Sequence, residues 1–260
     1  MKMFNFKYLQ IVIILIINIV FHCLLVDHNV LAADNKKIVL ATDVWEPYYG
    51  PDLINKGFFT EITKESFKRV GYNCVVCFVP WKRALELGKS GKYDGLLGAF
   101  YSIERTEFFE FSMPICAEQL VFFSKKNTIK KKYSSLHDLK GYIIGTVRGY
   151  HYTDEFHNAN YLTKDVATKT VDNISRLLLG RLDLVLASKL VFLHILRNDY
   201  PEIMNTLTRL EPPLVTSKLH ITISKQNQNY KQIIQDFNKG LKMIKEDNTF
   251  DNILKKHGLN

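Results

Sequence analysis

Apolar and polar positions follow two alternating periods along most of the chain. Short runs rich in β-branched and aromatic residues, at 37–41, 73–79 and 93–97, predict buried strands. Between them, apolar side chains at helical spacing predict helices at 59–70 and 81–89, each ended by glycine. Strands that alternate with helices over short connections indicate a parallel α/β sheet.

The same alternation continues through the second part of the chain. The pattern predicts strands at 120–124, 142–147, 182–187 and 219–224, and helices at 136–141, 173–179, 190–196, 230–244 and 250–257. The stretch from Tyr230 to Ile244 carries a well-formed apolar stripe on one helical face. No internal repeat or low-complexity tract interrupts this order, so the expected fold class is α/β.

Two loops that follow predicted strands carry the chemistry of a binding site. They span residues 43–49 and 98–105, and the carboxyl ends of parallel strands are where α/β sheets bind ligands. Ser102 is placed to cap a short helix, and Arg105 lies beside its free backbone N–H groups. A lone arginine is more often a surface ion-pair partner, but this arrangement suits a carboxylate. The run therefore points to a small anionic or zwitterionic ligand.

The first thirty-odd residues have the composition of an export signal. Lys2 and Lys7 precede an apolar run over 8–20, and small residues follow at a suitable cleavage position. We therefore predict a signal peptide over residues 1–32, a mature chain that begins near Ala33, and a periplasmic location. A retained N-terminal anchor is the alternative, although the apolar run is short for a membrane span.

The charge of the mature chain is positive but dispersed. Removing Lys2, Lys7 and Asp27 with the leader leaves 33 Lys and Arg against 25 Asp and Glu, a net charge of +8. This balance suits an anionic ligand or surface. The lysines are spread along the chain and no zinc-finger or RNA-binding motif accompanies them, so we expect no nucleic-acid partner.

The cysteines have no clear metal or redox pattern. Cys74 and Cys77 lie three residues apart on a predicted strand, where their side chains face opposite sides and are too distant for a disulfide. No second Cys or His pair follows at zinc spacing, so both are expected to be packing residues, and we expect no metal and no cofactor. A disulfide between Cys116 and one of them stays open, because the predicted compartment is oxidising.

The order of motifs resembles the family 3 extracellular solute-binding proteins, the polar amino-acid receptors of bacterial ABC importers. The match covers nearly all of the mature chain, and its specificity lies in the order and spacing of the motifs. They are Asp43 with Trp45 and Tyr48, Gly57-Phe58, the stretch 91–95, Glu104-Arg105, the stretch 111–114, Asp138 to Gly141, the turn 145–149, and Gly180 to Asp183. The run Pro80-Trp81-Lys-Arg-Ala-Leu resembles a branch of this family with less well-defined ligands.

The resemblance implies a two-lobed, periplasmic-binding-protein-like (type II) α/β fold with two hinge crossovers. One lobe would comprise residues 33–117 plus 219–260, and the other residues 118–218. The implied function is a periplasmic solute-binding protein that closes like a flytrap on an amino acid or related small carboxylate. Its partners would be that ligand and a membrane ABC permease, with the protein itself a monomer.

The resemblance also implies a set of ligand-binding residues. Arg105 would hold the ligand carboxylate, Trp45 and Trp81 would stack against the ligand, and the turn at 149–151 would complete the site from the second lobe. The full candidate set is Asp43, Trp45, Tyr48, Trp81, Phe100, Arg105, Gly149, Tyr150, His151 and Ser188.

Two departures from the family pattern concern the ligand's amino group. Ser188 occupies the position where many members have an aspartate that binds the α-ammonium, and the loop from 94 to 105 is one residue shorter, with Phe100 and Tyr101 where small hydroxyl residues are usual. The amino group would then depend on Asp43, Glu46 or aromatic rings, or the ligand lacks one.

Two other functions are compatible with the same fold. A cyclohexadienyl-dehydratase-like enzyme would need a general acid in the cleft, and Glu46 and His151 are the candidates. A ligand-sensing input protein would use the same binding site for signalling. The sequence has no nucleophile elbow and no complete phosphate loop, so we expect binding without catalysis.

Overall fold

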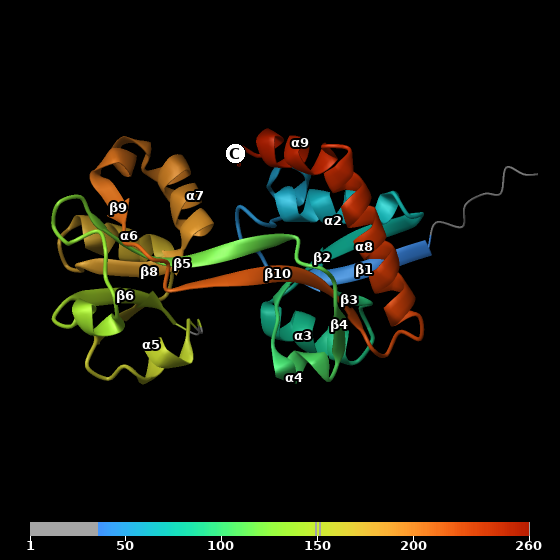
Figure 1. The fold of residues 1–260 in the computed structure, drawn as a ribbon, viewed down its shortest axis with the longest axis horizontal. Coiled ribbons are helices and arrows are strands. Elements are labelled where there is room, and N and C mark those ends of the chain that lie inside the picture. The colour runs from blue at the N-terminus through green and yellow to red at the C-terminus, as the bar shows by residue number, and fades with distance from the viewer. Residues whose placement is uncertain (1–35, 149, 151, 260) are drawn as a thin grey trace, which may run out of the picture.

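Two α/β lobes lie side by side and are joined by two long strands. A computed structural model describes residues 36–148, 150 and 152–259 of the 260-residue chain. The strands β5 (Cys116–Lys125) and β10 (Val215–Ser224) run from one lobe into the other, as Figure 1 shows. They pair antiparallel where they cross, from Val215 opposite Leu120 to Leu219 opposite Cys116. The predicted signal peptide and the predicted site residues Gly149 and His151 lie outside the described residues.

The first lobe contains a mostly parallel sheet. Its strand order is β2 (Tyr72–Phe78), β1 (Lys36–Thr42), β3 (Gly95–Phe100) and β10, with the short strand β4 (Phe109–Phe111) also paired to β10. β1 is parallel to both neighbours, and β10 is antiparallel to β3. The helices α2 (Phe58–Lys68) and α3 (Trp81–Lys89) connect successive strands, as the sequence pattern predicts.

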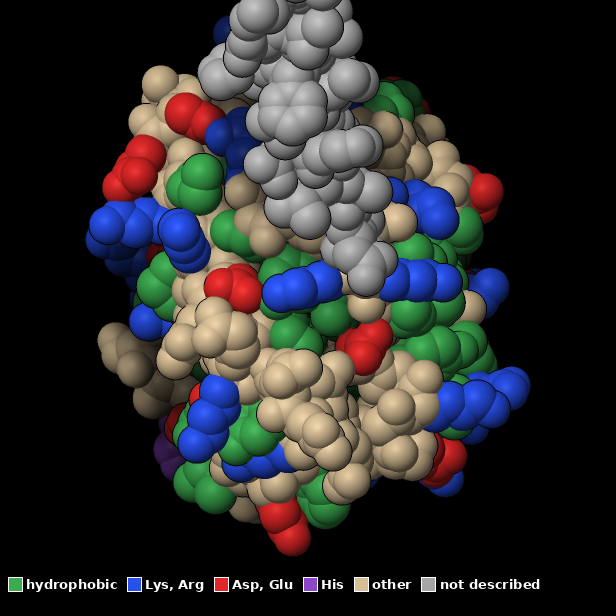
Figure 2. Space-filling view, turned by 90° about the vertical axis from the view of Figure 1, so that its right-hand side faces the viewer, with side chains coloured by type: hydrophobic (Ala, Val, Ile, Leu, Met, Phe, Trp, Pro, Cys, Tyr) green, Lys and Arg blue, Asp and Glu red, His purple; other side chains and the backbone are tan. Residues whose placement is uncertain are grey.

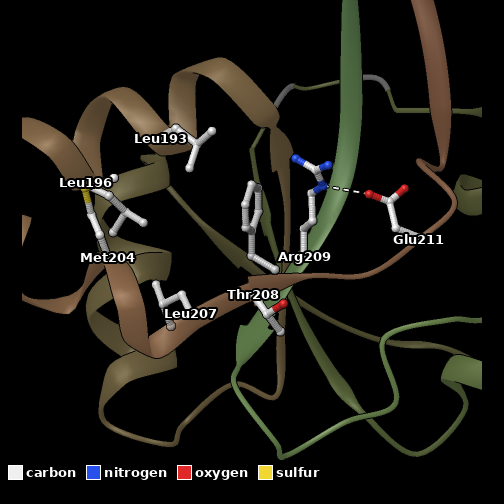
Figure 3. Close-up of a pocket in the computed structure, with 8 residues that line it drawn as sticks. Leu193, Leu196, Met204, Leu207, Thr208, Arg209 and Glu211 are labelled. Atoms are coloured by element: carbon white, nitrogen blue, oxygen red, sulfur yellow. Dashed lines mark hydrogen bonds and ion pairs between the residues drawn. The ribbon is translucent and has the colours of Figure 1, made fainter.

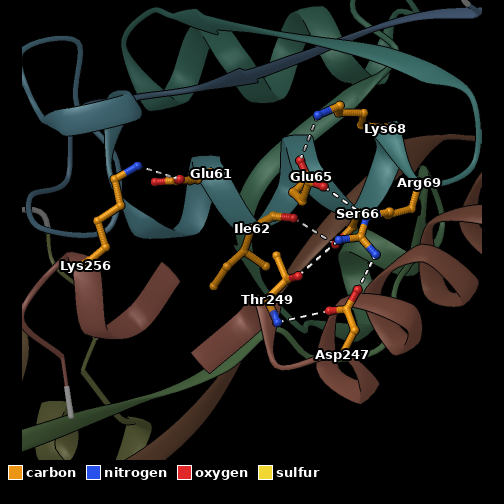
Figure 4. Close-up of polar contacts among 9 residues, drawn as sticks. All are labelled: Glu61, Ile62, Glu65, Ser66, Lys68, Arg69, Asp247, Thr249 and Lys256. Atoms are coloured by element: carbon orange, nitrogen blue, oxygen red, sulfur yellow. Dashed lines mark hydrogen bonds and ion pairs between the residues drawn. The ribbon is translucent and has the colours of Figure 1, made fainter. Parts of the chain in front are cut away.

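Helices α8 (Tyr230–Glu246) and α9 (Thr249–Lys256) complete the first lobe. α8 packs closely on α2, because a Cβ atom at Gly240 would lie only 1.9 Å from the backbone oxygen of Ser66. Polar contacts continue this interface (Figure 4). Arg69, at the end of α2, bonds to Glu65 and to the Thr249 hydroxyl at 3.0 Å each, and also pairs with Asp247.

The second lobe continues the sheet in the order β5, β8 (Leu184–Ser188), β6 (Ile143–Val147) and β7 (Thr163–Ala167), with β9 (Leu207–Arg209) paired to β5. Helices α5 (Asp154–Asn158), α6 (Thr170–Leu178) and α7 (Lys189–Asp199) cover it. Neighbouring residues of β5 face opposite sides, as strand geometry requires. Phe122 therefore belongs to one core cluster and Phe123 to another, where its ring stacks on that of Phe192 with a centroid distance of 3.7 Å.

The sequence pattern located most helices and strands, but it placed the starts of the two hinge strands too late in the chain. β5 begins at Cys116 and β10 at Val215, four residues before the expected starts at 120 and 219. These extra residues pair with each other, so their strand conformation depends on a partner segment far away in the chain. Strands β4, β7 and β9 and helix α5 were not predicted, because they are short and β7 mixes polar and apolar residues without a regular period. The remaining short helices are η2 (Ile54–Lys56), α4 (Ile103–Thr106), η3 (Leu136–Leu139) and η4 (Pro201–Thr206).

The outer surface of the first lobe is mixed in charge. Figure 2 shows Lys and Arg side chains dispersed among acidic, apolar and other groups on this face. Among the described helices, none is long and apolar enough to cross a membrane. Cys74, Cys77 and Cys116 are free thiols, and burial raises the pKa of Cys74 and of Cys116 to about 12.

Candidate functional site

A cavity of about 470 Å³ lies where the two lobes and the hinge strands meet. In size it matches a pocket for a small organic molecule. The loops after β1 and β3 and the start of α3 contribute from the first lobe, while the start of α7 and the segment after β6 contribute from the second. The lining residues are Asp43, Trp45, Tyr49, Trp81, Gly98, Phe100, Tyr101, Arg105, Glu118, Leu120, Tyr150, Tyr152, Ser188 and Ser217.

Arg105 presents a half-buried guanidinium group to this cavity. Its Nη1 atom donates a hydrogen bond to the backbone oxygen of Phe100 at 2.8 Å, and its central carbon lies 5.6 Å from the centroid of the Trp81 ring. Burial lowers the pKa of Arg105, but guanidinium groups stay charged in proteins. The guanidinium group is thus held by one hydrogen bond and by the Trp81 ring, and no described residue accepts a hydrogen bond from its other N–H groups, which suit a ligand carboxylate.

Ser102 does not act as the expected side-chain cap of α4. Its backbone is extended and its carbonyl oxygen accepts from the backbone N–H groups of Arg105 and Thr106, at 3.0 and 3.2 Å. Its hydroxyl makes no capping hydrogen bond. The α4 helix is a single turn, so the Arg105 side chain, rather than a helix N-terminus, is the candidate anion-binding group here.

Aromatic rings form much of the cavity surface. Trp45 lies with its ring centroid 6.0 Å from that of Phe100, in an edge-on arrangement, and 6.0 Å from that of Tyr49. A tight turn places these rings, since the Trp45 N–H donates to the Tyr49 carbonyl at 2.8 Å. Aromatic faces accommodate both aliphatic chains and cations.

Tyr48, expected at the ligand, instead lies behind the cavity surface. It is fully buried, its ring stacks on Trp45 at a centroid distance of 4.3 Å, and its hydroxyl donates to the carboxylate of Glu118. Its neighbour Tyr49 lines the cavity in its place. Adjacent side chains of this turn point in different directions, which the residue types do not reveal.

The second lobe contributes the predicted residues Tyr150 and Ser188. Ser188 ends β8 and caps α7, where its hydroxyl accepts from the Val191 N–H at 3.3 Å. Tyr150 is partly exposed and lies close to Asp43, whose charge raises the pKa of the Tyr150 hydroxyl after the larger effect of burial. Tyr152 also lines the cavity, and its hydroxyl accepts from the Val147 N–H at 2.8 Å.

Two carboxyl groups lie at the cavity. Asp43 directly follows β1, and burial raises its pKa to about 6. Glu118, which the sequence patterns did not indicate, lies on the hinge strand β5 with only 1% of its surface exposed. Burial raises the pKa of Glu118 to about 7, although the nearby Ser188 hydroxyl and Lys189 amide oppose this shift. The only sequence signal was an acidic residue next to a predicted apolar strand.

Glu46, a sequence candidate for the amino group or for an acid, does not line the cavity. Its Oε2 atom lies 3.3 Å from Nε2 of His194 on α7, so the carboxylate already has a partner. Within the described residues no group of His, Cys, Asp and Glu side chains has the arrangement of a metal site.

A second cavity, of about 380 Å³, lies within the second lobe (Figure 3). Apolar side chains of β5, α7, η4 and β9 line it, and an ion pair between Arg209 and Glu211 at 2.7 Å lies at one side. It contains none of the predicted site residues. The cavity between the lobes is therefore the better candidate.

Comparison with known proteins identifies the fold. Three similar structures are an amino-acid ABC transporter substrate-binding protein, AbpA, from Streptococcus pneumoniae bound to L-arginine, the GluR0 ligand-binding core from Nostoc punctiforme with L-glutamate, and a histidine kinase sensor domain similar to periplasmic binding proteins. Each is 19% identical with a TM-score of 0.65. The matches to AbpA and to the sensor domain each cover 86% of this chain and 96% of the matched chain. The match to the GluR0 core covers 84% of this chain and 98% of the matched chain.

These structures confirm the expected two-lobed, type II periplasmic-binding-protein fold. Among curated proteins, no sequence relative matches this chain. The family model of the bacterial extracellular solute-binding proteins, family 3, matches residues 38–260. The motifs quoted above, from Asp43 to Asp183, thus pointed to the correct family, although the narrower branch suggested by Pro80 to Leu85 stays a prediction. The chain belongs to the bacterial extracellular solute-binding proteins, family 3.

Proposed function

We propose that this protein captures an amino acid or a related small carboxylate in the cavity between its lobes and delivers it to a membrane ABC permease. The observation that carries this proposal is the guanidinium group of Arg105, which lies in the cavity beside the Trp81 ring and has N–H donors that bond to none of the described residues. A planar guanidinium binds a carboxylate with two parallel hydrogen bonds.

The two lobes are proposed to close on the ligand. We assign residues 33–117 plus 219–260 to the first lobe and 118–218 to the second. Separate core clusters support this division, one set formed by β1, α2 and α8 and the other by β6, β8 and α6. Since lining residues come from both sides, a ligand that contacts both lobes favours the arrangement in which they are closest.

Each proposed ligand residue has a distinct role. Arg105 binds the carboxylate, while Trp45, Trp81 and Phe100 contact the apolar part of the ligand from the first lobe. Tyr150 and Ser188 contact it from the second lobe. Asp43 offers a negative charge, and Tyr48 supports Trp45 from behind. The contribution of Gly149 and His151 stays a prediction.

Calorimetry on two arginine variants would test the site. A thermal-shift screen of amino acids, polyamines, keto acids and prephenate-like compounds first identifies a ligand through its stabilisation of the folded state. Arg105→Ala should then weaken binding of a carboxylate about 100-fold, since a hydrogen-bonded ion pair contributes up to about 3 kcal/mol. Arg83→Ala, on the exposed side of α3, should leave affinity unchanged. Full affinity in Arg105→Ala would refute the proposed role.

A sensory role is the second candidate, and the likeness to a histidine kinase sensor domain favours it. Uptake assays separate the two functions. Cells without an importer's binding protein lose uptake of the labelled ligand, whereas cells without a sensor keep the transport step itself. N-terminal sequencing of the exported protein would test the proposed signal peptide, because cleavage after residue 32 leaves Ala33 first.

An enzyme on the same fold is the remaining alternative. Asp43 and Glu118 have raised pKa values inside the cavity, and general acids often have this property. We propose that these groups bind a cationic ligand group and do not transfer protons to it. Incubation of each ligand with the protein, followed by mass spectrometry, should return the ligand unchanged.

A further inference from the structure

Glu118 is a buried carboxylate, and within the described residues only one of its two oxygens makes a close hydrogen bond. Its Oε2 atom accepts a hydrogen bond from the Tyr48 hydroxyl. Its Oε1 atom is also buried and accepts no hydrogen bond of ordinary length from any residue that the structure describes, although the Ser188 hydroxyl and the backbone N–H groups of Lys189 and Gln119 lie near enough to the carboxylate to lower its pKa. Burial of an unpaired charged oxygen is unfavourable, so such a group normally has a donor or a cation beside it.

The side chain of Lys189, whose charge acts on Glu118, does not fill this position. Lys189 follows Ser188 at the start of α7, and its charge lowers the pKa of Glu118 somewhat. Its Nζ atom, however, lies 3.3 Å from the side-chain oxygen of Gln119, on the opposite face of β5 from Glu118. The carboxylate of Glu118 therefore lacks an ion-pair partner from this lysine.

Strand geometry places Glu118 at the cavity. Leu120, two residues further along β5, shares its face and lines the same cavity. Ser217, the residue opposite Glu118 on β10, lines it too. Glu118 thus lies at the crossing of the two hinge strands, a point that both lobes approach.

The charges around the cavity are unequal. Among the described lining residues, Arg105 is the only basic side chain, whereas Asp43 and Glu118 are both acidic. A ligand with only carboxylate groups would bring no positive charge to either acidic side chain. A ligand that also carries a cationic nitrogen would match the cavity, and the aromatic rings around it favour cations as well.

We propose that Glu118 forms a cation subsite, which binds an ammonium or guanidinium group of a ligand whose carboxylate is bound by Arg105. This inference rests on the proposed function and narrows its ligand class to amino carboxylates. It also explains how the site could bind an amino group although Ser188 cannot supply a negative charge, because Glu118 on the hinge strand β5 supplies one instead.

Four probes with the same carbon chain separate the contributions of each charged group. L-Lysine carries both an α-amine and a terminal amine. L-Norleucine carries only the α-amine, 6-aminohexanoate carries only the terminal amine, and hexanoate carries neither. Calorimetric affinities are compared for wild type, Glu118→Gln and the control Glu86→Gln, which removes an equivalent charge from the exposed side of α3. Glu118→Gln keeps the side-chain shape and an oxygen that can accept from Tyr48.

We expect wild type to prefer at least one amine-bearing probe over hexanoate. Glu118→Gln should weaken that probe about tenfold or more and leave hexanoate unchanged or stronger, while Glu86→Gln alters neither. Equal effects of Glu118→Gln on all probes, a wild-type preference for hexanoate, or no binding of any probe would each overturn the inference. If Glu118→Gln does not fold, Tyr48→Phe should produce the same selective loss, about threefold, by releasing the carboxylate.

The results also separate this inference from the proposed function. Hexanoate binding that depends on Arg105 but gains nothing from amines would support carboxylate capture and refute the cation subsite. Conversely, amine-selective loss in Glu118→Gln combined with full affinity in Arg105→Ala would support the subsite and refute the assigned carboxylate site.

Discussion

The Nε2 atom of His194 lies 3.3 Å from the Oε2 atom of Glu46, and this contact joins helix α7 of the second lobe to the loop after β1 of the first. Both side chains are partly exposed, at 19% and 36%. Leu190 and Val191, at the start of α7, pack against the core of the first lobe beside it. The pair therefore contributes to how the lobes are positioned.

Breaking this pair should weaken ligand binding only slightly. The contact is ionic only while His194 is protonated, and its Nε2 atom also lies 3.0 Å from Nδ2 of Asn198. Even a partly exposed ion pair contributes only about 0.2–1 kcal/mol, so His194→Ala should lower affinity by no more than about fivefold. A double-mutant cycle with Glu46→Gln, measured by calorimetry, would isolate the interaction. An effect of His194→Ala that persists in full when Glu46 is already replaced would show that the contact does not act through this carboxylate.

Ligand binding should change the intrinsic tryptophan fluorescence. The chain contains two tryptophans, and Trp45 and Trp81 both line the cavity. Trp81→Ala should weaken binding about tenfold through loss of ring contacts, and the remaining signal would come from Trp45. The control is Tyr161→Ala, an aromatic replacement outside the cavity. A wild-type spectrum unaffected by a saturating ligand would place the bound ligand elsewhere.

The stability of the ligand-free protein should fall as pH rises from about 4.5 to about 7. The pKa of Glu118 is raised from 4.5 to about 7 by burial, so the folded state binds a proton more tightly than the unfolded state within this window. That stabilisation is present below the lower value and is lost as pH rises through the upper one. The pKa of Asp43, raised to about 6, adds in the same direction.

Urea unfolding of wild type and Glu118→Gln across this range would measure the effect. The pKa of His220 is lowered by burial, which makes stability rise with pH and partly masks the trend. The difference between the two proteins removes this contribution. Parallel stability curves for wild type and Glu118→Gln would mean that Glu118 titrates normally in the folded state.

Gly240→Ala should lower the melting temperature by several degrees. Alanine normally stabilises a helix relative to glycine by about 1 kcal/mol. Here its Cβ would lie 1.9 Å from the Ser66 backbone oxygen, so α8 must move away from α2. Overpacking of this kind costs about 1–3 kcal/mol. Lys239→Ala, at the exposed neighbouring position, serves as the control in differential scanning calorimetry and should have little effect. An unchanged or higher melting temperature for Gly240→Ala would contradict the close packing.

Residue patterns were sufficient where local chemistry decides structure. The alternation of short apolar runs with helical stripes identified β1, α2, β2 and α3 in the right order, because each element buries its own apolar side against a neighbour. Arg105, Trp45 and Trp81 were predicted at the site, and the structure places all three at one cavity. The carboxyl-end rule for parallel sheets brought their loops together without knowledge of any contact.

Residue patterns did not predict the direction in which individual side chains point. Tyr48 and Tyr49 are identical in type and adjacent, yet one is buried on Glu118 and the other lines the cavity. Only the turn from Trp45 to Tyr49, closed by backbone hydrogen bonds, determines which ring faces which way.

The sequence by itself determined the family, the order of strands and helices, and the arginine and two tryptophans that line the cavity, since these depend on local periodicity and motif spacing. Only the tertiary structure decided that Glu118 lines the cavity between the lobes. Its position depends on the pairing of β5 with β10, two segments far apart in the chain, and no local pattern records which residues meet across such a pairing. Burial beside that pairing, rather than residue type, raises the pKa of this carboxyl group.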